Sequence, residues 1–236
     1  MNYLSKLKIQ LANYFPFTSR LSRLIKATYH AISNPKNSYS QHGEDVFIWN
    51  KLREAFPGVE YNYIDIGAFH PVLLSNTYLL YRKKMKGITV EPNIELSHLH
   101  KLFRPADIQL QIACSAINGL SKFYFQQTFP ALSSLNDIHT KRKVKERYVP
   151  VLNLDTICQS LGLLKVHFLS IDVEGFDFEV LEGGQNLLPN VFLICIECDT
   201  PDMEDKVRLF LNEKGFIFLK QFSCNLVFRN ENFSLN

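Results

Sequence analysis

From residue 59 onward, short apolar runs alternate with longer segments in which apolar residues recur at helical spacing. Five nearly continuous apolar runs are predicted strands, at residues 59–67, 87–93, 107–115, 166–175 and 191–198. Such runs are typical of parallel strands that are covered on both faces. The segments predicted to be helices lie at 75–84, 94–103, 176–188 and 203–215. This alternation predicts an α/β fold with a doubly wound, mostly parallel sheet.

The last third and the middle of the chain depart from this alternation. Two apolar runs, 216–220 and 225–229, follow one another without a helix between them, which predicts a closing antiparallel hairpin. In the middle, short runs at 122–126 and 149–154 flank a polar stretch. We interpret that stretch as an insertion over the carboxyl edge of the sheet, where ligands bind in doubly wound folds.

The N-terminal segment has a different character. We expect residues 1–37 to form a basic, amphipathic helical extension and residues 38–236 to form one domain. Apolar residues recur every three or four positions on both sides of Pro16, and the segment has six basic residues and no acidic one: Lys6, Lys8, Arg20, Arg23, Lys26 and Lys36. Basic amphipathic helices rest on anionic membranes or pack on their own domain. Residues 1–36 are therefore a candidate for peripheral membrane contact, and packing is the alternative.

Composition narrows the class of protein. The 236 residues are 46% hydrophobic and 21% charged, which is ordinary for a globular protein and excludes a disordered or fibrous chain. No apolar stretch reaches the roughly 18 residues that a membrane-spanning helix needs. The five cysteines are an odd number and most lie in apolar runs, which indicates reduced thiols and a cytoplasmic location.

The first candidate site follows the first predicted strand. This strand ends near Asp65, and Gly67 opens a turn, but Phe69 and His70 stand where the later glycines of a dinucleotide-binding loop would be. A pyrophosphate needs that glycine-lined approach, whereas a cofactor without phosphates does not. Glu91 ends the next strand, 24 residues after Gly67, where an acid accepts hydrogen bonds from both ribose hydroxyls. The combination indicates an adenosine-type ligand without phosphates, such as S-adenosylmethionine.

A second group of acids follows the later strands. Asp172 ends the fourth strand and Glu174 comes two residues later, and both should lie at the ligand-binding edge of the sheet. Paired carboxylates can act as a general base, bind substrate hydroxyls or hold a divalent cation. His70 is another candidate base, and Glu197 and Asp199 end the fifth strand at the same edge. The sequence does not choose between a base and a metal site.

Eight segments, in order, resemble S-adenosylmethionine-dependent methyltransferases of the FkbM type. They are YSQHGEDVFI (39–48), YIDIGAFHPVLLSNTYLLY (63–81), GITVEPN (87–93), IACSAINGLSKFYF (112–125), SSL (133–135), VLNLDTIC (151–158), IDVEGFDFEVLEG (171–183) and IECD (196–199). The resemblance spans residues 38–229. It implies the seven-stranded class I methyltransferase fold with an antiparallel last strand. It also implies methyl transfer to an oxygen of a sugar, nucleotide-sugar or glycan acceptor.

The resemblance also implies roles for residues around the cofactor. Asp65 and Gly67 would form the loop on the methionine side, and Glu91 would bind the ribose. Ser115 would lie near the adenine, although many relatives have an acid near this position.

The N-terminal part of the domain and the later strand ends complete the implied site. Gln41 and Asp45, in the segment that also holds Ser40 and Glu44, would close the cofactor side. Asp172 and Glu174 would face the acceptor, as bases or as ligands of a divalent cation.

Three other functions compete with methyl transfer to a sugar. A nicotinamide-dependent Rossmann oxidoreductase would need the glycines that are missing after Gly67. A non-catalytic glycan-assembly scaffold would not need the acids at the strand ends. A nucleic-acid enzyme has as its only support the basic run at Lys141, Arg142, Lys143, Lys145 and Arg147, and a phosphate footprint is normally broader. We therefore expect no nucleic-acid partner. The run is either a solvated face or a grip for a phosphate or acidic sugar on the acceptor.

Overall fold

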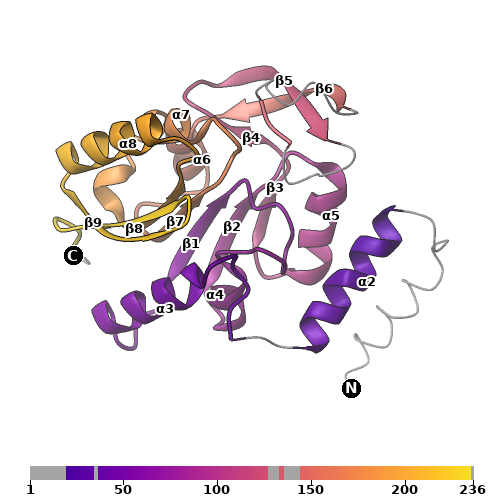
Figure 1. The fold of residues 1–236 in the computed structure, drawn as a ribbon, viewed down its shortest axis with the longest axis horizontal. Coiled ribbons are helices and arrows are strands. Elements are labelled where there is room, and N and C mark those ends of the chain that lie inside the picture. Colours follow the sequence, from indigo (N-terminus) through magenta and orange to yellow (C-terminus); the bar gives the residue numbers. More distant parts are fainter. Residues whose placement is uncertain (1–19, 35–36, 127–132, 136–143, 235–236) are drawn as a thin grey trace.

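The computed structural model describes residues 20–34, 37–126, 133–135 and 144–234 (Figure 1). Its centre is a seven-stranded sheet with the order β3-β2-β1-β7-β8-β10-β9. The strands are β1 (Asn62–Ile66), β2 (Lys86–Val90), β3 (Ile108–Leu110), β7 (Val166–Ile171), β8 (Val191–Glu197), β9 (Phe216–Phe222) and β10 (Asn225–Asn230).

The strand directions are those of a class I methyltransferase fold. Strands β3, β2, β1, β7 and β8 are parallel, and β10 is antiparallel to both of its neighbours, β8 and β9. The predicted doubly wound sheet with an antiparallel last strand is therefore confirmed. The order changes direction at β1, with β2 on one side and β7 on the other, and ligands bind at such a switch point in open α/β sheets.

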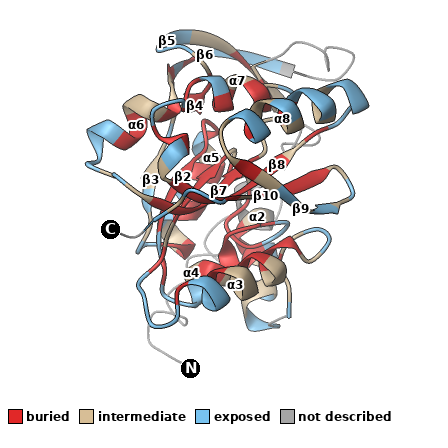
Figure 2. Cartoon of the chain, turned by 90° about the vertical axis from the view of Figure 1, so that its left-hand side faces the viewer, coloured by how far each residue is buried: buried red, intermediate tan, exposed pale blue. Residues whose placement is uncertain are grey.

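Alternate residues of each strand build two different cores. Ile64 and Leu169 lie on the face that α6 (Leu154–Ser160), α7 (Asp177–Glu182) and α8 (Pro201–Glu213) cover. Tyr63 and Phe168 lie on the opposite face, against α3 (Glu44–Ala55) and α4 (Tyr78–Arg82). Burial on both faces explains why these strands are almost continuously apolar, and Figure 2 shows the buried residues concentrated in the central strands.

Two helices of the structure were not expected from the sequence, and α4 and α7 are shorter than their predicted ranges. Helices α3 and α6 were not predicted, whereas α5 (Ile94–Phe103) matches its predicted range. The seven-residue α6 is too short to show a clear helical period, and its start depends on Asn153, whose side chain accepts a hydrogen bond from the Thr156 N–H at 2.8 Å. A short helix of this kind is stabilised by its cap and by tertiary packing more than by its own pattern.

The expected strand at 107–115 divides into two strands that belong to different sheets. Its first part is β3, and its second part, β4 (Ala113–Cys114), pairs with β6 (Val144–Leu152) in a second sheet of order β4-β6-β5. Strand β5 (Gly119–Gln126) completes that sheet, which lies at the top of Figure 1. The Ser134 hydroxyl donates to the Glu174 carbonyl at 2.7 Å, so the inserted segment is tied to the loop after β7. Much of the polar stretch lies outside the described residues.

Helix α2 (Arg20–Ser33) packs beside α5, as Figure 1 shows. Ile25 is buried against Leu96, Leu99 and Phe103 of α5. The other predicted half of the N-terminal extension, residues 1–19, lies outside the described residues. Among the helices that are described, none is long and apolar enough to cross a membrane.

Candidate functional site

A cavity opens at the carboxyl ends of β1, β2, β7 and β8, with the inserted sheet on one side. Its apolar wall includes Phe69, Ile112, Ala113, Cys114, Phe123 and Leu135. Five carboxylic acids also line it: Asp65, Glu91, Asp172, Glu174 and Glu197. None of the described residues that line it is a lysine or an arginine. The cavity therefore presents an apolar wall and a strongly acidic floor, which suits a cationic ligand or one rich in hydroxyl groups.

Gly67 brings the first loop against the end of β7. Its φ of 77° is in the left-handed region, and a Cβ at this position would overlap the carbonyl oxygen of Asp172. The N–H groups of Gly67 and Ala68 both donate to the Val90 carbonyl, at 3.0 and 3.1 Å. These bonds fasten the loop across the ends of β1 and β2. Glycine is needed at position 67 because of its left-handed φ and because of the close approach to Asp172.

The carboxylate of Glu91 is oriented by the backbone. One oxygen accepts a hydrogen bond from the Phe69 N–H at 3.0 Å, and the other accepts from the Asn93 N–H at 2.7 Å. Burial raises the pKa of Glu91 to about 8, against the lowering effect of these two bonds. A carboxylate has about four lone-pair sites, so one site on each oxygen is left for a ligand. This geometry suits a pair of adjacent hydroxyls.

Asp65 is held from behind by a buried cation. The Thr77 hydroxyl donates to one Asp65 oxygen, and the same hydroxyl accepts from an Arg104 amino group at 3.0 Å. Arg104 itself lies 3.9 Å from Asp65. Burial raises the pKa of Asp65, and the charge of Arg104 opposes that rise. The carboxylate thus has a fixed orientation at the cavity wall.

Arg104 also anchors the rest of this region. It is 1% exposed, and it donates to Asp107 at 2.7 Å and to the Tyr63 hydroxyl at 2.7 Å. The sequence analysis did not identify Arg104 or Thr77. A basic residue just after a helix looks like an ordinary partner of the helix dipole, and no local pattern marks it as buried.

The second group of acids lies where β7 and β8 end. Oxygen atoms of Asp172, Glu174 and Glu197 lie within 4.8 Å of one another. Burial and the charge of Glu197 raise the pKa of Asp172 well above its ordinary value. Burial and neighbouring carboxylates raise the pKa of Glu174 to about 8 and that of Glu197 to about 7. The group therefore holds protons at neutral pH and can give up or accept one readily.

The backbone around Glu174 is unusual. Its φ of 56° is in the left-handed region, which is uncommon for a residue with a side chain. The Asp177 carboxylate accepts from the N–H groups of Val173 and Gly175, at 2.9 and 3.0 Å, and so fixes the turn. Strain of this kind persists where the surrounding structure enforces it, often at functional sites.

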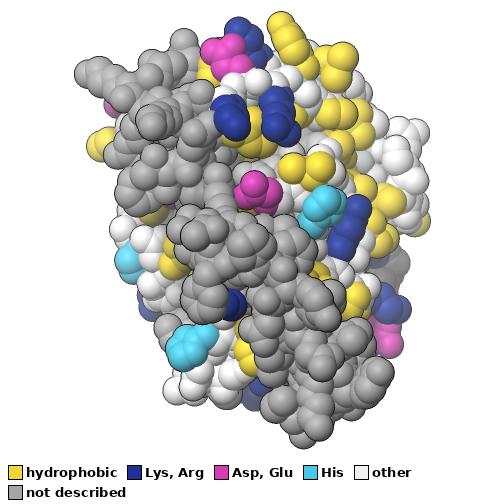
Figure 3. Space-filling model, turned by 90° about the vertical axis from the view of Figure 1, so that its right-hand side faces the viewer, with side chains coloured by type: hydrophobic (Ala, Val, Ile, Leu, Met, Phe, Trp, Pro, Cys, Tyr) yellow, Lys and Arg dark blue, Asp and Glu magenta, His cyan; other side chains and the backbone are white. Residues whose placement is uncertain are grey.

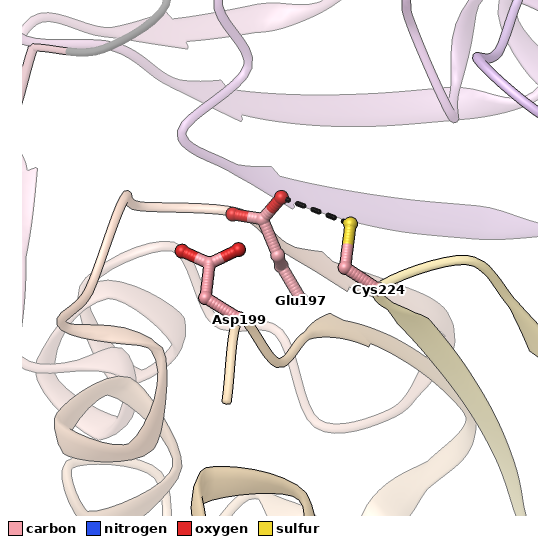
Figure 4. A group of neighbouring side chains, drawn as sticks. All are labelled: Glu197, Asp199 and Cys224. Carbon is pink, nitrogen blue, oxygen red and sulfur yellow. Dashed lines mark hydrogen bonds between the residues drawn. The ribbon is translucent and has the colours of Figure 1, made fainter. Parts of the chain in front are cut away.

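Figure 4 shows the outer part of the acidic group, where Glu197, Asp199 and Cys224 come together. The Cys224 thiol donates to Glu197 at 3.4 Å. Burial raises the pKa of Cys224 to about 11, so this thiol stays protonated and acts as a hydrogen-bond donor. Cys224 therefore orients Glu197 through this hydrogen bond.

Six of the nine candidate residues line the cavity: Gln41, Asp65, Gly67, Glu91, Asp172 and Glu174. His70 is not among the lining residues. Its Nδ1 accepts from the N–H groups of Val72 and Leu73, and its Nε2 lies 2.9 Å from the Thr28 hydroxyl of α2. Burial lowers its pKa to about 4. Both ring nitrogens thus have hydrogen-bond partners, and His70 joins the first loop to α2.

Asp45 and Ser115 are also outside the cavity lining. Asp45 accepts from the hydroxyls of Ser38 and Ser40, at 2.7 and 2.8 Å, and thereby shapes the loop that carries Gln41. Ser115 is buried and packs beside Gly183, while its neighbours Ala113 and Cys114 reach the cavity. Both residues support the site from behind instead of lining it as expected.

The strand order and a ligand cavity at the switch point define the chain as a protein with the class I methyltransferase fold. The Methyltransferase FkbM domain model matches residues 65–218, which is more than half of the chain. The chain therefore belongs to the FkbM methyltransferase family, and this family membership argues against the nicotinamide-dependent alternative.

Two solved structures match this chain at low sequence identity. One is a TehB-like S-adenosylmethionine-dependent methyltransferase from Corynebacterium glutamicum, with 9% identity and a TM-score of 0.43 over 89% of this chain and 98% of that one. The other is described as a ribosomal RNA methyltransferase from Plasmodium falciparum, with 12% identity and a TM-score of 0.38 over 83% of this chain and 98% of that one. A comparison with curated proteins gave no match.

The role of Gly67 can be tested with a matched glycine. Gly58 has nearly the same φ, 78°, but nothing lies within 4 Å of a Cβ placed there. We expect Gly58→Ala to cost about 1–2 kcal/mol, the backbone penalty alone. Gly67→Ala should cost about 1–3 kcal/mol more, because it adds the overlap with Asp172. Urea denaturation of both variants measures the difference, and equal losses would contradict the close approach.

A second variant tests the buried cation. Arg104→Met keeps the length of the side chain but leaves Asp65 and Asp107 buried without their positive partner. Breaking a buried ion pair in this way costs about 3–5 kcal/mol. The control is Arg208→Met, which removes a partly exposed ion pair with Glu204 on α8 and should cost less than about 1 kcal/mol. Similar unfolding free energies for the two variants would show that Arg104 does not support the site.

Proposed function

We propose that this protein transfers a methyl group from S-adenosylmethionine to a hydroxyl of a sugar, nucleotide-sugar or glycan acceptor. The observation that carries the proposal is the pairing of Gly67 and Glu91 in one cavity. The Glu91 carboxylate is oriented by two backbone N–H groups and keeps one lone-pair site free on each oxygen. That arrangement fits the two hydroxyls of a ribose.

The charge of the cavity supports the same cofactor. Bound S-adenosylmethionine supplies an activated methyl group on a positively charged sulfur, and its methionine part carries an ammonium group. The cavity offers five carboxylic acids to these cationic groups, and its apolar wall at Ile112, Ala113 and Cys114 offers a surface for an adenine ring. A dinucleotide would instead place a pyrophosphate against the acids, which is unfavourable.

The acids at the ends of β7 and β8 suit the proton transfer that an acceptor hydroxyl requires. A sugar hydroxyl is a poor nucleophile until its proton is removed. Burial and the charge of Glu197 raise the pKa of Asp172, so we favour Asp172 as the base, with Glu197 and Glu174 beside it. The remaining task of the protein is to align the acceptor oxygen with the methyl carbon and the sulfur.

A divalent cation is a second way to activate the hydroxyl. Asp172, Glu174 and Glu197 offer three hard oxygen ligands close enough to hold one. A bound cation would acidify the acceptor hydroxyl. The two versions of the proposal differ in one measurable property, the effect of a chelator on turnover.

The cofactor part is tested by Glu91→Ala. This change removes two charge-assisted hydrogen bonds to the ribose, each worth about 1.5–3 kcal/mol. We expect the affinity for S-adenosylhomocysteine to fall at least tenfold in calorimetry. The control is Glu60→Gln, which removes an exposed acid that pairs only with Lys86 at the surface. Unchanged binding in the Glu91 variant would exclude this residue from the cofactor site.

The chemical part is tested by Asp172→Asn, with labelled S-adenosylmethionine, candidate nucleotide sugars or glycan extracts, and mass spectrometry to detect the methyl gain. Removing a base or a metal ligand should lower turnover about 10²-fold or more, with little change in cofactor binding. Asp202→Asn, at an exposed position on α8, is the control. Loss of activity in EDTA and recovery with magnesium or manganese would support the metal version. Cofactor binding without methyl transfer to any acceptor would favour a non-catalytic scaffold.

The raised pKa values predict opposite effects of pH on turnover and on stability. Glu197 and Glu174 have pKa values of about 7 and 8, so the ionised base forms as the pH rises from 6 to 9, and turnover should rise. Folding favours their protonated forms, so their contribution to the free energy of unfolding is fully present below about pH 4.5 and is lost as the pH rises through 7–8. Glu197→Gln should flatten the stability change. A stability that increases over this pH range would contradict the assignment.

A further inference from the structure

The β5–β6 hairpin has two faces of different chemistry, and its register separates them. The strands are antiparallel, and the directly opposite pairs include Phe123 with Arg147 and Phe125 with Lys145. Side chains of directly opposite residues lie on the same face of a sheet. Phe123, Phe125, Lys145 and Arg147 therefore share one face. Lys122, Tyr124, Glu146 and Tyr148 lie on the other.

The face with the phenylalanines is the one that meets the cavity. Phe123 lines the cavity and packs in a small core with Ala113, Val149 and Val151. Arg147 is the cross-strand neighbour of Phe123. Lys145 precedes Arg147 by two residues in β6 and lies on the same face. Both basic residues are exposed. They therefore lie on the outer part of the surface that continues from the cavity wall.

The two faces differ in how their charges are balanced. On the outer face, Lys122 pairs with Glu146 at 3.0 Å. On the cavity face, neither Lys145 nor Arg147 forms an ion pair with a carboxylate in the part of the chain that the structure describes. The Arg147 guanidinium lies over the Phe125 ring at 5.9 Å, which orients the group and leaves its N–H donors available. In Figure 3, basic side chains gather near the top, at the end of the molecule where Figure 1 places the hairpin.

The hairpin and the cavity thus have opposite charges. Among the described residues, the lining of the cavity includes five acids and no lysine or arginine, whereas the adjoining hairpin face has two cations without acidic partners. A ligand that reaches from one to the other would place hydroxyls among the acids and a negative group at the hairpin. Arg and Lys bind phosphate and carboxylate oxygens by charge-assisted hydrogen bonds.

We propose that Lys145 and Arg147 form a subsite for an oxyanion of the acceptor, so that the enzyme prefers a sugar that carries a phosphate or a carboxylate over a neutral one. This inference rests on the proposed function, because it concerns the acceptor of the same reaction. It assigns the two residues a role in acceptor specificity and none in the chemical step.

The test uses calorimetry of the full chain with S-adenosylhomocysteine present and three probes: glucose 1-phosphate, glucuronate and glucose. We expect at least one anionic sugar to bind tenfold or more tightly than glucose. The double variant Lys145→Gln, Arg147→Gln should lose that difference, whereas Lys122→Gln, on the other face of the same hairpin, should keep it. If the double variant does not bind S-adenosylhomocysteine, the two single variants replace it.

Each outcome decides the inference. Preference for glucose 1-phosphate alone identifies a phosphate as the group, and preference for glucuronate alone identifies a carboxylate. Equal affinities for all three sugars would overturn the subsite, as would an equal loss in the Lys122 variant. The subsite would also be overturned by a third result: short single-stranded RNA binds more tightly than either anionic sugar, and its affinity falls equally in the double variant and in the Lys122 variant. If the wild-type protein failed to bind S-adenosylhomocysteine, that result would count against the proposed function. The comparison of the three sugars, repeated without S-adenosylhomocysteine, would still test the hairpin subsite.

Discussion

A single buried guanidinium holds together the part of the molecule that carries the loop after β1. Arg104 follows α5, yet its donors reach Tyr63 in β1, Thr77 before α4 and Asp107 before β3. Each contact satisfies a polar group that would otherwise be buried at a cost of several kcal/mol. Through Thr77 the same cation orients Asp65 at the cavity wall. The stability of this region and the shape of the ligand site therefore have a common origin.

The sheet could be predicted from the sequence because its signal is local. Strands such as Val166–Ile171 are buried on both faces, and a continuous apolar run records that directly. The acids that line the cavity, such as Glu91 and Asp172, were found because strand ends in such sheets meet at one edge. Residues in networks could not be assigned in this way. The sequence shows that His70 and Asp45 are polar and near a loop, but the partner that occupies His70 Nε2 is Thr28, 42 residues away.

The acids of the cavity form one electrostatic unit rather than separate sites. Burial raises the pKa of each acid, and neighbouring charges add to this: Asp65 raises the pKa of Glu91, Asp172 raises that of Glu174, and Glu197 raises that of Asp172. Binding a positive ligand would favour the ionised form of every member. A bound cation lowers the pKa of the neighbouring carboxylic acids, which raises the fraction that is ionised at a given pH and lowers the basicity of each carboxylate. The two effects have opposite signs, and the raised starting pKa values place the balance near neutral pH.

The loop after β1 and the end of β7 are in direct contact at Gly67. Its neighbour in the first loop, Phe69, donates to Glu91 through its N–H and accepts from the His100 side chain through its carbonyl. On the other side, the Asp172 N–H donates to the Ile66 carbonyl at 3.0 Å, so the end of β7 is bonded to the start of the same loop. A shift of the loop that improved contact with a cofactor would therefore move the backbone of Asp172 as well. Because β1 lies directly beside β7 in the sheet, the first loop and the acids at the end of β7 cannot move independently of one another.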